Sequence, residues 1–200
     1  PGFLRCSITI TFEGRKYTEI ATAAFEPEKI KYTVKEPKDF EQFWMDIQQK
    51  AKKVPLDLKL TLIKEKCTDL YDLFQIDYQN IEYKNRSYGI LTIPKKEGKF
   101  PAVIRFPGAG VRPPSGNVEM AENGVITLDL YIHPFPLTFE KSFYDQLANS
   151  SFIDYKFWGV QDKNTYYYKR AIAGCLKAID VIYSLPQFDG RNLAAWGASQ

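Results

Sequence analysis

Apolar and polar side chains alternate along the first 25 residues of the chain. One alternating run covers residues 4–12 and a second covers residues 17–25, with the polar break Glu13-Gly14-Arg15 between them. Because successive side chains of a strand point to opposite faces, two such runs around a short turn predict a β-hairpin. A hairpin alone is marginally stable in water, so we expect this one to be the end of a β-sandwich-like module at residues 1–28.

Helical and strand-like spacings follow one another through the rest of the chain. Apolar residues recur at helical spacing in 40–47 and again in 166–183. Strands are predicted at residues 56–66, 70–83, 87–94, 102–106, 124–131 and 193–196, with a turn at 83–89 and a short helix within 111–123. Strand, helix and strand alternate towards the end of the chain, which predicts an α/β domain over residues 29–200 with a mostly parallel sheet flanked by helices.

The last predicted strand runs directly into Gly197-Ala198-Ser199-Gln200, four of the five positions of the Gly-x-Ser-x-Gly pattern. In that pattern a strand turns sharply into a helix, and the serine hydroxyl projects above the sheet edge as a nucleophile. The amide of the following residue, here Gln200, then points to where a tetrahedral oxyanion forms. Helix, loop, strand and serine turn follow in the order of an α/β-hydrolase truncated after the nucleophile turn, with Ser199 as the catalytic nucleophile.

A second small-residue stretch, Pro107-Gly108-Ala109-Gly110, follows the predicted strand at 102–106. A serine hydrolase needs two backbone donors aimed at the oxyanion, and one comes from a small-residue loop after an early central strand. Glycines permit the close approach that such a loop requires. We therefore predict that the backbone amide of Ala109 is the second oxyanion donor; the alternative is a glycine-rich turn without function.

His133 is the single histidine of the chain and follows the predicted strand at 124–131. In α/β-hydrolases the order along the chain is serine, acid and then histidine, whereas His133 precedes Ser199. We expect it to line the substrate pocket or to bond a loop instead of acting as the base. The long aromatic segment at 136–164 suits a lid or substrate wall, so Trp158, with Tyr155 and Phe157, is a candidate for sugar contacts.

Composition narrows the classes of function. A formal net charge of +3, with lysines and acids interspersed, does not suggest nucleic-acid binding, and no apolar run is long enough for a membrane span. The three cysteines are widely spaced and read as buried apolar residues, so with one histidine we expect no metal site. The chain opens with Pro1 and carries no signal peptide, so we expect the true start to lie elsewhere.

Several segments together resemble the acetyl xylan esterase and cephalosporin C deacetylase group, carbohydrate esterase family seven. The resemblance runs from about residue 39 to 200 and rests on the helix start at Asp39-Phe40, the segment Asp162-Lys163-Asn164-Thr165-Tyr166-Tyr167-Tyr168, the Leu185-Pro186 and Asp189 spacing, and glutamine directly after Ser199. It implies removal of acetyl groups from sugar hydroxyls of acetylated xylan or related oligosaccharides through an acyl-enzyme, with no cofactor. It also implies bacterial export to the periplasm or outside the cell, with oligomers possible, and an acid and a base beyond residue 200.

Two departures from the family pattern are visible. The family's His-Gly-Tyr is replaced by Pro107-Gly108-Ala109, and its Arg-Gly-Gln-Gly is replaced around Tyr131-Ile132-His133-Pro134. A backbone donor survives the first change, whereas a side-chain contact does not. Two alternatives stay open: a serine peptidase of the prolyl-oligopeptidase kind, against which Gln200 counts because those peptidases more often carry an aromatic there, and a catalytically inactive carbohydrate-binding accessory protein.

Overall fold

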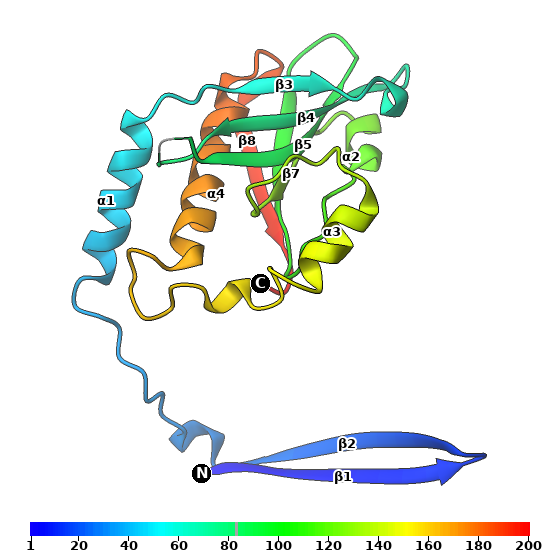
Figure 1. Ribbon diagram of the computed structural model, residues 1–200, viewed down its shortest axis with the longest axis vertical. Helices are drawn as coiled ribbons and strands as arrows, with labels where there is room; N and C mark the ends of the chain where they lie inside the picture. Colours follow the sequence, from blue (N-terminus) through cyan, green and yellow to red (C-terminus); the bar gives the residue numbers. More distant parts are fainter. Residues whose placement is uncertain (83) are drawn as a thin grey trace. The chain divides into compact units, whose positions relative to one another are not determined.

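The computed structural model describes residues 1–82 and 84–200, and the chain divides into two compact units, Pro1–Glu41 and Gln42–Gln200 (Figure 1). Tyr83, which ends the predicted strand at 70–83 and begins the predicted turn at 83–89, lies outside the described residues. The assignment of residues 1–28 to an all-β module and of residues 29–200 to the α/β domain stays a prediction.

The first unit contains the predicted hairpin, formed by β1 (Gly2–Phe12) and β2 (Arg15–Phe25), followed by the short η1 (Pro27–Lys29). The strands pair antiparallel without a register shift, from Gly2 opposite Phe25 to Phe12 opposite Arg15. Glu13 and Gly14 form the turn with φ of 48° and 76°. Positive φ at both central residues matches the right-handed twist of the two strands, so the hairpin is confirmed.

The second unit contains a six-stranded sheet, four α-helices and two short 3-10 helices among the described residues. Its strands are β3 (Lys59–Leu62), β4 (Tyr71–Gln79), β5 (Arg86–Pro94), β6 (Phe100–Phe106), β7 (Ile126–Tyr131) and β8 (Phe188–Gly197). Its helices are α1 (Phe40–Lys53), η2 (Lys64–Lys66), α2 (Val118–Glu122), α3 (Lys141–Ala148), η3 (Tyr155–Phe157) and α4 (Tyr167–Ser184). The predicted helices at 40–47 and 166–183, and the short one within 111–123, are confirmed.

The strands lie in the order β3-β4-β5-β7-β6-β8. The pairs β3-β4, β4-β5 and β5-β7 are antiparallel, whereas β6 pairs parallel with both β7 and β8. Because β7, β6 and β8 run parallel, their carboxyl ends lie at one edge of the sheet. In open α/β sheets this edge is where ligands bind, and both small-residue stretches follow strands that end there.

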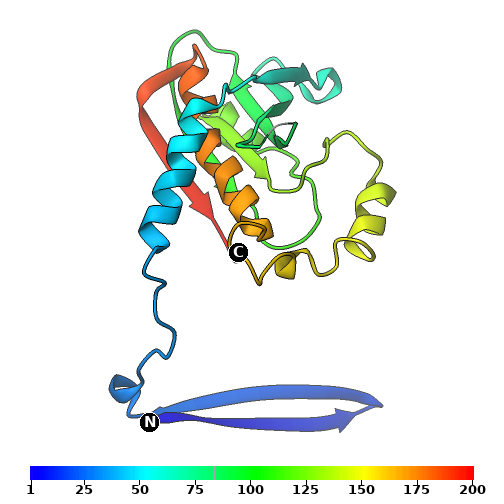
Figure 2. The ribbon, with the colours of Figure 1, turned by 60° about the vertical axis from the view of Figure 1, so that its left-hand side comes forward.

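Helices cover both faces of this sheet (Figures 1 and 2). On one face α4 packs Ala178, Val181 and Ile182 against Leu91, Ile104 and Leu128 of the central strands. On the other face Ala121 of α2 packs with Leu73 and Ile90. The central strands therefore carry apolar side chains on both of their faces, as a sheet covered by helices on both sides requires.

Helix α1 packs against α4 and against Ile81, which follows β4. Ile47 and Ala51 of α1 cluster with Ala173 of α4. Lys177 of α4 is buried beside them, and its ammonium donates to the carbonyls of Ala51 (3.2 Å) and Val54 (2.8 Å) at the end of α1. A buried lysine is tolerated here because its charge meets carbonyls at a helix C-terminus, where the helix dipole favours a cation.

The strand predicted at residues 56–66 is shorter than expected. Only Lys59–Leu62 is extended, and Lys64–Lys66 forms the 3-10 turn η2. The turn brings the chain back to β4: the amide of Ile63 donates to the carbonyl of Leu73 at 2.9 Å, and the amide of Thr68 donates to that of Tyr71 at 3.1 Å. The prediction was wrong for residues 64–66 because the amides of Lys66 and Cys67 donate to the carbonyls of Ile63 and Lys64 in a 3-10 turn, which the alternation of side chains does not reveal.

Candidate active site

The backbone at Ser199 has the left-handed φ that a nucleophile turn requires. Its φ is 73°, in a region that residues with a side chain seldom occupy. Ser199 follows β8 after Gly197 and Ala198, and a Cβ on Gly197 would lie 3.3 Å from the Cβ of Phe106 on β6. Small residues are therefore needed where β8 ends beside β6, as they are in the sharp turn of the Gly-x-Ser-x-Gly pattern.

The glycine loop, residues 107–110 after β6, lies directly against the serine turn, residues 197–200. A Cβ on Gly108 would be 3.3 Å from the carbonyl oxygen of Ala198, 3.5 Å from the Cβ of Ser199 and 4.0 Å from its Oγ. The structure thus brings together the two stretches that the sequence singled out. This proximity follows from the parallel pairing of β6 with β8, in which Phe106 lies opposite Gly197.

Both backbone groups of Gly110 are bonded within the protein. Its amide donates to the hydroxyl of Tyr155 at 3.1 Å, and its carbonyl lies 3.1 Å from Nε2 of His133. The carbonyl of Ala109 accepts from Nη2 of Arg112 at 3.1 Å. Since the Gly110 amide is already occupied, it cannot serve an oxyanion, whereas none of the described residues accepts a hydrogen bond from the Ala109 amide.

His133 lies beneath the glycine loop and has no exposed surface. A carbonyl only accepts, so the contact with Gly110 assigns the proton to Nε2, and Nδ1 then accepts from the hydroxyl of Tyr167 at 2.7 Å. The Tyr167 hydroxyl also lies 3.2 Å from the carbonyl of Ile132, which accepts from Arg170 at 2.6 Å, and of these two acceptors Nδ1 of His133 is the closer for its one proton. Of the roles considered from sequence, His133 therefore bonds a loop; buried and with both nitrogens engaged, it neither lines an open pocket nor accepts a serine proton.

Burial keeps the His133 imidazole neutral. It lowers the pKa of His133 from 6.5 to about 4, the hydrogen bond to the Gly110 carbonyl opposes this shift, and the nearby Arg170 guanidinium adds to it. A neutral imidazole at physiological pH preserves the assignment of one donor and one acceptor nitrogen. The charge state of His133 thus supports a fixed glycine loop.

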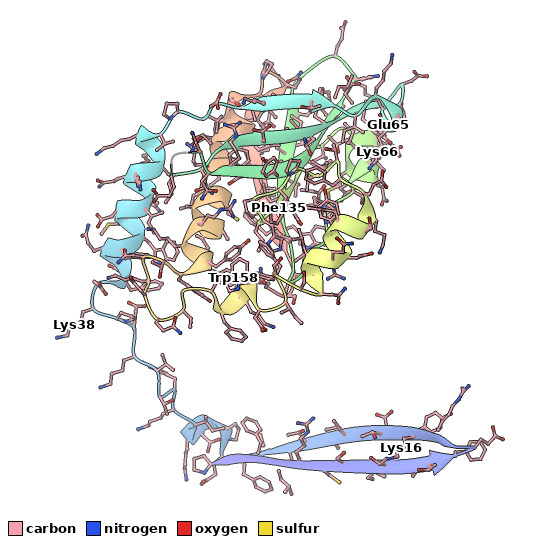
Figure 3. The ribbon with its side chains drawn as sticks, viewed as in Figure 1. Lys16, Lys38, Glu65, Lys66, Phe135 and Trp158 are labelled. Carbon is pink, nitrogen blue, oxygen red and sulfur yellow. The ribbon has the colours of Figure 1, made fainter. Side chains whose placement is uncertain are left out.

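Gln200 and Trp158 differ in their surroundings. The side-chain Oε1 of Gln200 accepts from the hydroxyl of Tyr155 at 2.9 Å. Trp158 packs edge-on against Tyr167, with ring centroids 5.7 Å apart, but keeps 39% of its surface exposed (Figure 3). Trp158 therefore has an open face for a ligand, and its contact with sugar stays a prediction.

Two cavities flank the serine turn. One of about 260 Å³ is lined by the ion pair of Arg105 and Asp129 (2.7 Å), by Trp196 and by Gly108 and Ala198. The other, of about 360 Å³, is largely apolar and is lined by Phe106, Pro107, Tyr168, Ile172 and Gln200 among others. In the first cavity burial raises the pKa of Asp129, while the Arg105 guanidinium lowers it.

The comparisons with known proteins identify the family. The acetyl xylan esterase (AXE1) family profile matches residues 23–200. The chain belongs to the acetyl xylan esterase family. Acetyl esterase Axe7A of Xylanibacter ruminicola is 33% identical over 207 residues, which cover 100% of this chain and 46% of that protein. The chain thus spans about half the length of the curated relative it matches.

Solved structures of acetyl xylan esterases share the fold of this family member. The acetyl xylan esterase from Paenibacillus sp. R4 has a TM-score of 0.66 at 18% identity, covering 84% of this chain and 54% of that one. Acetyl Xylan Esterase 1 from Thermoanaerobacterium sp. JW/SL YS485 has a TM-score of 0.64 at 17% identity, covering 82% and 51%. These matches confirm the predicted α/β-hydrolase fold. None of the described helices is long and apolar enough to cross a membrane.

Sequence reasoning assigned Tyr155 of this acetyl xylan esterase family member incorrectly and passed over Arg112. Tyr155 was a candidate for sugar contacts, but only 4% of its surface is exposed, and its hydroxyl bonds Gly110 and Gln200. Nothing in the local pattern of the aromatic segment separates a buried tyrosine from an exposed one. Arg112 had a weak signal, since a cation two residues after a glycine loop can bond the loop's carbonyls.

Proposed function

We propose that this chain carries the nucleophile and the oxyanion donors of a serine esterase that removes acetyl groups from acetylated xylan or related oligosaccharides. The observation that carries the proposal is the left-handed φ of 73° at Ser199, at the end of a parallel strand, with Gly108 packed against that serine. Family membership supports the acetyl ester as substrate. The acyl group and the polymer itself belong to the proposal because the chain spans 46% of its curated relative.

The proposed reaction has two displacements. Ser199 Oγ attacks the acetyl carbonyl carbon while a base takes its proton, and the carbonyl oxygen becomes an oxyanion facing the amides of Gln200 and Ala109. Collapse breaks the bond to the sugar oxygen, which leaves with a proton as the free hydroxyl. Water then adds to the acetyl-enzyme by the same route and releases acetate and the serine.

The base is not His133, because that imidazole is buried and bonded at both nitrogens. Consistent with the order serine, acid and histidine, we place the acid and the base after Ser199. Since polymeric xylan does not cross a membrane unaided, we also infer that the protein acts in the periplasm or outside the cell.

The test uses the complete natural gene product that contains this chain. Hydrolysis of 4-nitrophenyl acetate and release of acetate from acetylated xylan are measured for the wild type, Ser199→Ala and Ser150→Ala. Ser150 is an exposed serine whose hydroxyl donates to the carbonyl of Gln146, so its loss controls for removing a hydroxyl elsewhere. We expect Ser199→Ala to lose roughly 10⁴-fold or more in kcat, as other triad serines do, and Ser150→Ala to match the wild type.

Other outcomes favour the alternatives. Retained activity in Ser199→Ala would contradict the assignment of the nucleophile. A folded wild type that cleaves a proline-containing peptide and no acetyl ester would favour the peptidase, and one that binds acetylated xylan without turnover would favour the accessory protein. Covalent labelling of Ser199 by a phosphonate probe, read by mass spectrometry, reports an activated serine independently of substrate.

A further inference from the structure

The buried hydroxyl of Tyr155 bonds both the glycine loop and the serine turn. Tyr155 belongs to η3, in the aromatic segment between β7 and α4, and only 4% of its surface is exposed. Its hydroxyl accepts from the amide of Gly110 at 3.1 Å and donates to Oε1 of Gln200 at 2.9 Å. Gly110 precedes Tyr155 by 45 residues and Gln200 follows it by 45, so the contact joins three distant segments.

The direction of both hydrogen bonds is determined by the chemistry of the groups. A backbone amide only donates, so the tyrosine oxygen accepts from Gly110 and its one proton remains for an acceptor. The carboxamide oxygen of Gln200 supplies that acceptor. The two bonds therefore form at the same time and polarise each other in the same direction.

On the loop side, Tyr155 restrains the peptide unit that follows the predicted donor. The peptide between Ala109 and Gly110 is bonded at its carbonyl by Arg112 and at its amide by Tyr155. Gly110 has a φ of 121°, in a region open to glycine, so the chain there has freedom that these bonds remove. With that peptide plane held at both edges, the Ala109 amide one residue earlier keeps its direction.

The ring of Tyr155 is itself held in place. It packs perpendicular to the His133 ring, with centroids 4.7 Å apart, and against Tyr167 at 5.3 Å. His133 bonds the carbonyl of the same Gly110 whose amide Tyr155 bonds. The hydroxyl is thus placed before any substrate arrives, as a preorganised site requires.

We propose that Tyr155 is a positioning residue whose hydroxyl sets the separation of the two oxyanion donors, the amides of Ala109 and Gln200. The inference rests on the proposed esterase function and assigns Tyr155 no contact with substrate. On the turn side it acts through the Gln200 side chain, which anchors the residue whose backbone amide is the donor. On the loop side it acts through Gly110.

The first variant is Tyr155→Phe in the complete gene product, assayed with 4-nitrophenyl acetate. Removal of one oxyanion donor lowers kcat by about 10²–10³. Here both donors remain but lose their fixed positions, so we expect kcat to fall by roughly 10- to 100-fold while KM stays within about 3-fold. A KM effect without a kcat effect would indicate a ground-state contact instead.

Tyr144→Phe is the matched control. Tyr144 is equally buried, and its hydroxyl also makes two bonds, accepting from the amide of Phe139 at 3.2 Å and donating to the carbonyl of Pro136 at 2.7 Å. Neither partner belongs to the glycine loop or the serine turn. Both variants should lower the melting temperature similarly, whereas kcat should fall only in Tyr155→Phe.

A double-mutant cycle tests the hydrogen bond between Tyr155 and Gln200. Gln200→Met removes the acceptor but keeps the backbone amide and a similar volume, and Gln200→Glu keeps an oxygen acceptor. We expect Gln200→Met to lower kcat. The double variant Tyr155→Phe with Gln200→Met should have a kcat no lower than that of the poorer single variant. Gln200→Glu should recover part of the kcat that Gln200→Met loses. Additive losses in kcat would show that the two residues act independently.

Hydrogen exchange gives a readout that does not depend on catalysis. Loss of the Tyr155 hydroxyl should speed exchange of the Gly110 amide, and Tyr144→Phe should not. Unchanged exchange at Gly110 would overturn the inference, as would an active wild type in which Tyr155→Phe keeps the kcat of Tyr144→Phe. A wild type inactive on every acyl ester would instead overturn the proposed function, and the catalytic role of Tyr155 with it.

Discussion

Acidification should remove the stability that the neutral imidazole of His133 contributes to the fold. The imidazole is fully buried, donates to the Gly110 carbonyl, and accepts from the Tyr167 hydroxyl only while it is neutral. Its pKa in the fold is about 4, against 6.5 for an ordinary histidine, chiefly because of burial. The unfolded chain therefore takes up a proton near pH 6.5 that the folded chain refuses until about pH 4.

The magnitude follows from these two pKa values. The neutral imidazole contributes its full stabilisation above pH 6.5. This contribution to the free energy of unfolding is lost as the pH falls from 6.5 to 4, because the unfolded state binds more protons than the folded state in this range. Each unit of pKa difference corresponds to about 1.4 kcal/mol, so the free energy of unfolding should fall by about 2 kcal/mol between pH 7 and pH 5, and by about 3 kcal/mol in total below pH 4.

The assay is urea unfolding at half-unit pH steps from 4 to 7.5, with the wild type compared with His133→Gln. Glutamine does not titrate but can still donate to the Gly110 carbonyl, so the variant retains the remaining pH dependence of the protein. The quantity of interest is the difference in slope between the two proteins. We expect the wild-type slope to be steeper by up to about 1.4 kcal/mol per pH unit between pH 4.5 and 6.

An NMR titration measures the same pKa directly. The imidazole carbon-bound protons of His133 are assigned by their loss in His133→Gln and followed with pH. A pKa of 6 or above for His133, or identical slopes for the two proteins, would refute the reasoning, because either result means that the folded site accepts the proton. Either result would also mean that a neutral His133 does not hold the glycine loop in place.

Three substitutions test other contacts. Gly108→Ala places a methyl group 3.5 Å from the Cβ and 4.0 Å from the Oγ of Ser199, and should lower esterase kcat by roughly 10-fold or more, since reacting groups tolerate little displacement. Gly174→Ala places a methyl group 2.5 Å from the Oγ of Ser87, so α4 or the Ser87 side chain must shift and the free energy of unfolding should fall by about 1–3 kcal/mol. Leu128→Ala opens a cavity in the core at a fully buried position and should cost about 2–5 kcal/mol in urea unfolding.

Each of these substitutions has a control within the chain. Gly2→Ala adds a methyl group with nothing within 4 Å, so it reports the intrinsic effect of replacing glycine. Leu4→Ala removes a side chain that is 62% exposed and should change stability by less than about 0.5 kcal/mol. If Gly174→Ala resembled Gly2→Ala, or Leu128→Ala resembled Leu4→Ala, the packing described for α4 and the sheet would be incorrect.

Much of the fold was predictable because its signals are local. The hairpin turn at Glu13 and Gly14, the helical spacing at residues 40–47 and the buried run at 126–131 each depend on neighbours within a few positions. The strand predicted at 56–66 ends early because the chain turns at 64–66, between the bonds of Ile63 to Leu73 and of Thr68 to Tyr71. The interior position of Lys177 also depends on a distant segment, since its ammonium meets carbonyls at the end of α1.

The candidate site also has a part that could be predicted from local sequence and a part that could not. The serine turn and the glycine loop are short patterns whose small residues are a steric requirement, so Ser199, Gln200 and Ala109 could be singled out from sequence alone. That Gly108 lies against Ser199 depends on the pairing of β6 with β8, which no local pattern specifies. Family membership raised the expectation of this pairing without supplying the contacts.

By itself, the sequence determined the order of elements, the position of the sharp turn at Ser199 and the class of chemistry that a strained serine suits. Only the tertiary structure decided what His133 and Tyr155 do, because a polar side chain takes its role from the groups that folding brings to it. Tyr155 lies 45 residues from each of its partners, Gly110 and Gln200. Because both side chains are buried, these hydrogen bonds are needed for stability, since a polar group removed from water must find its partners within the fold.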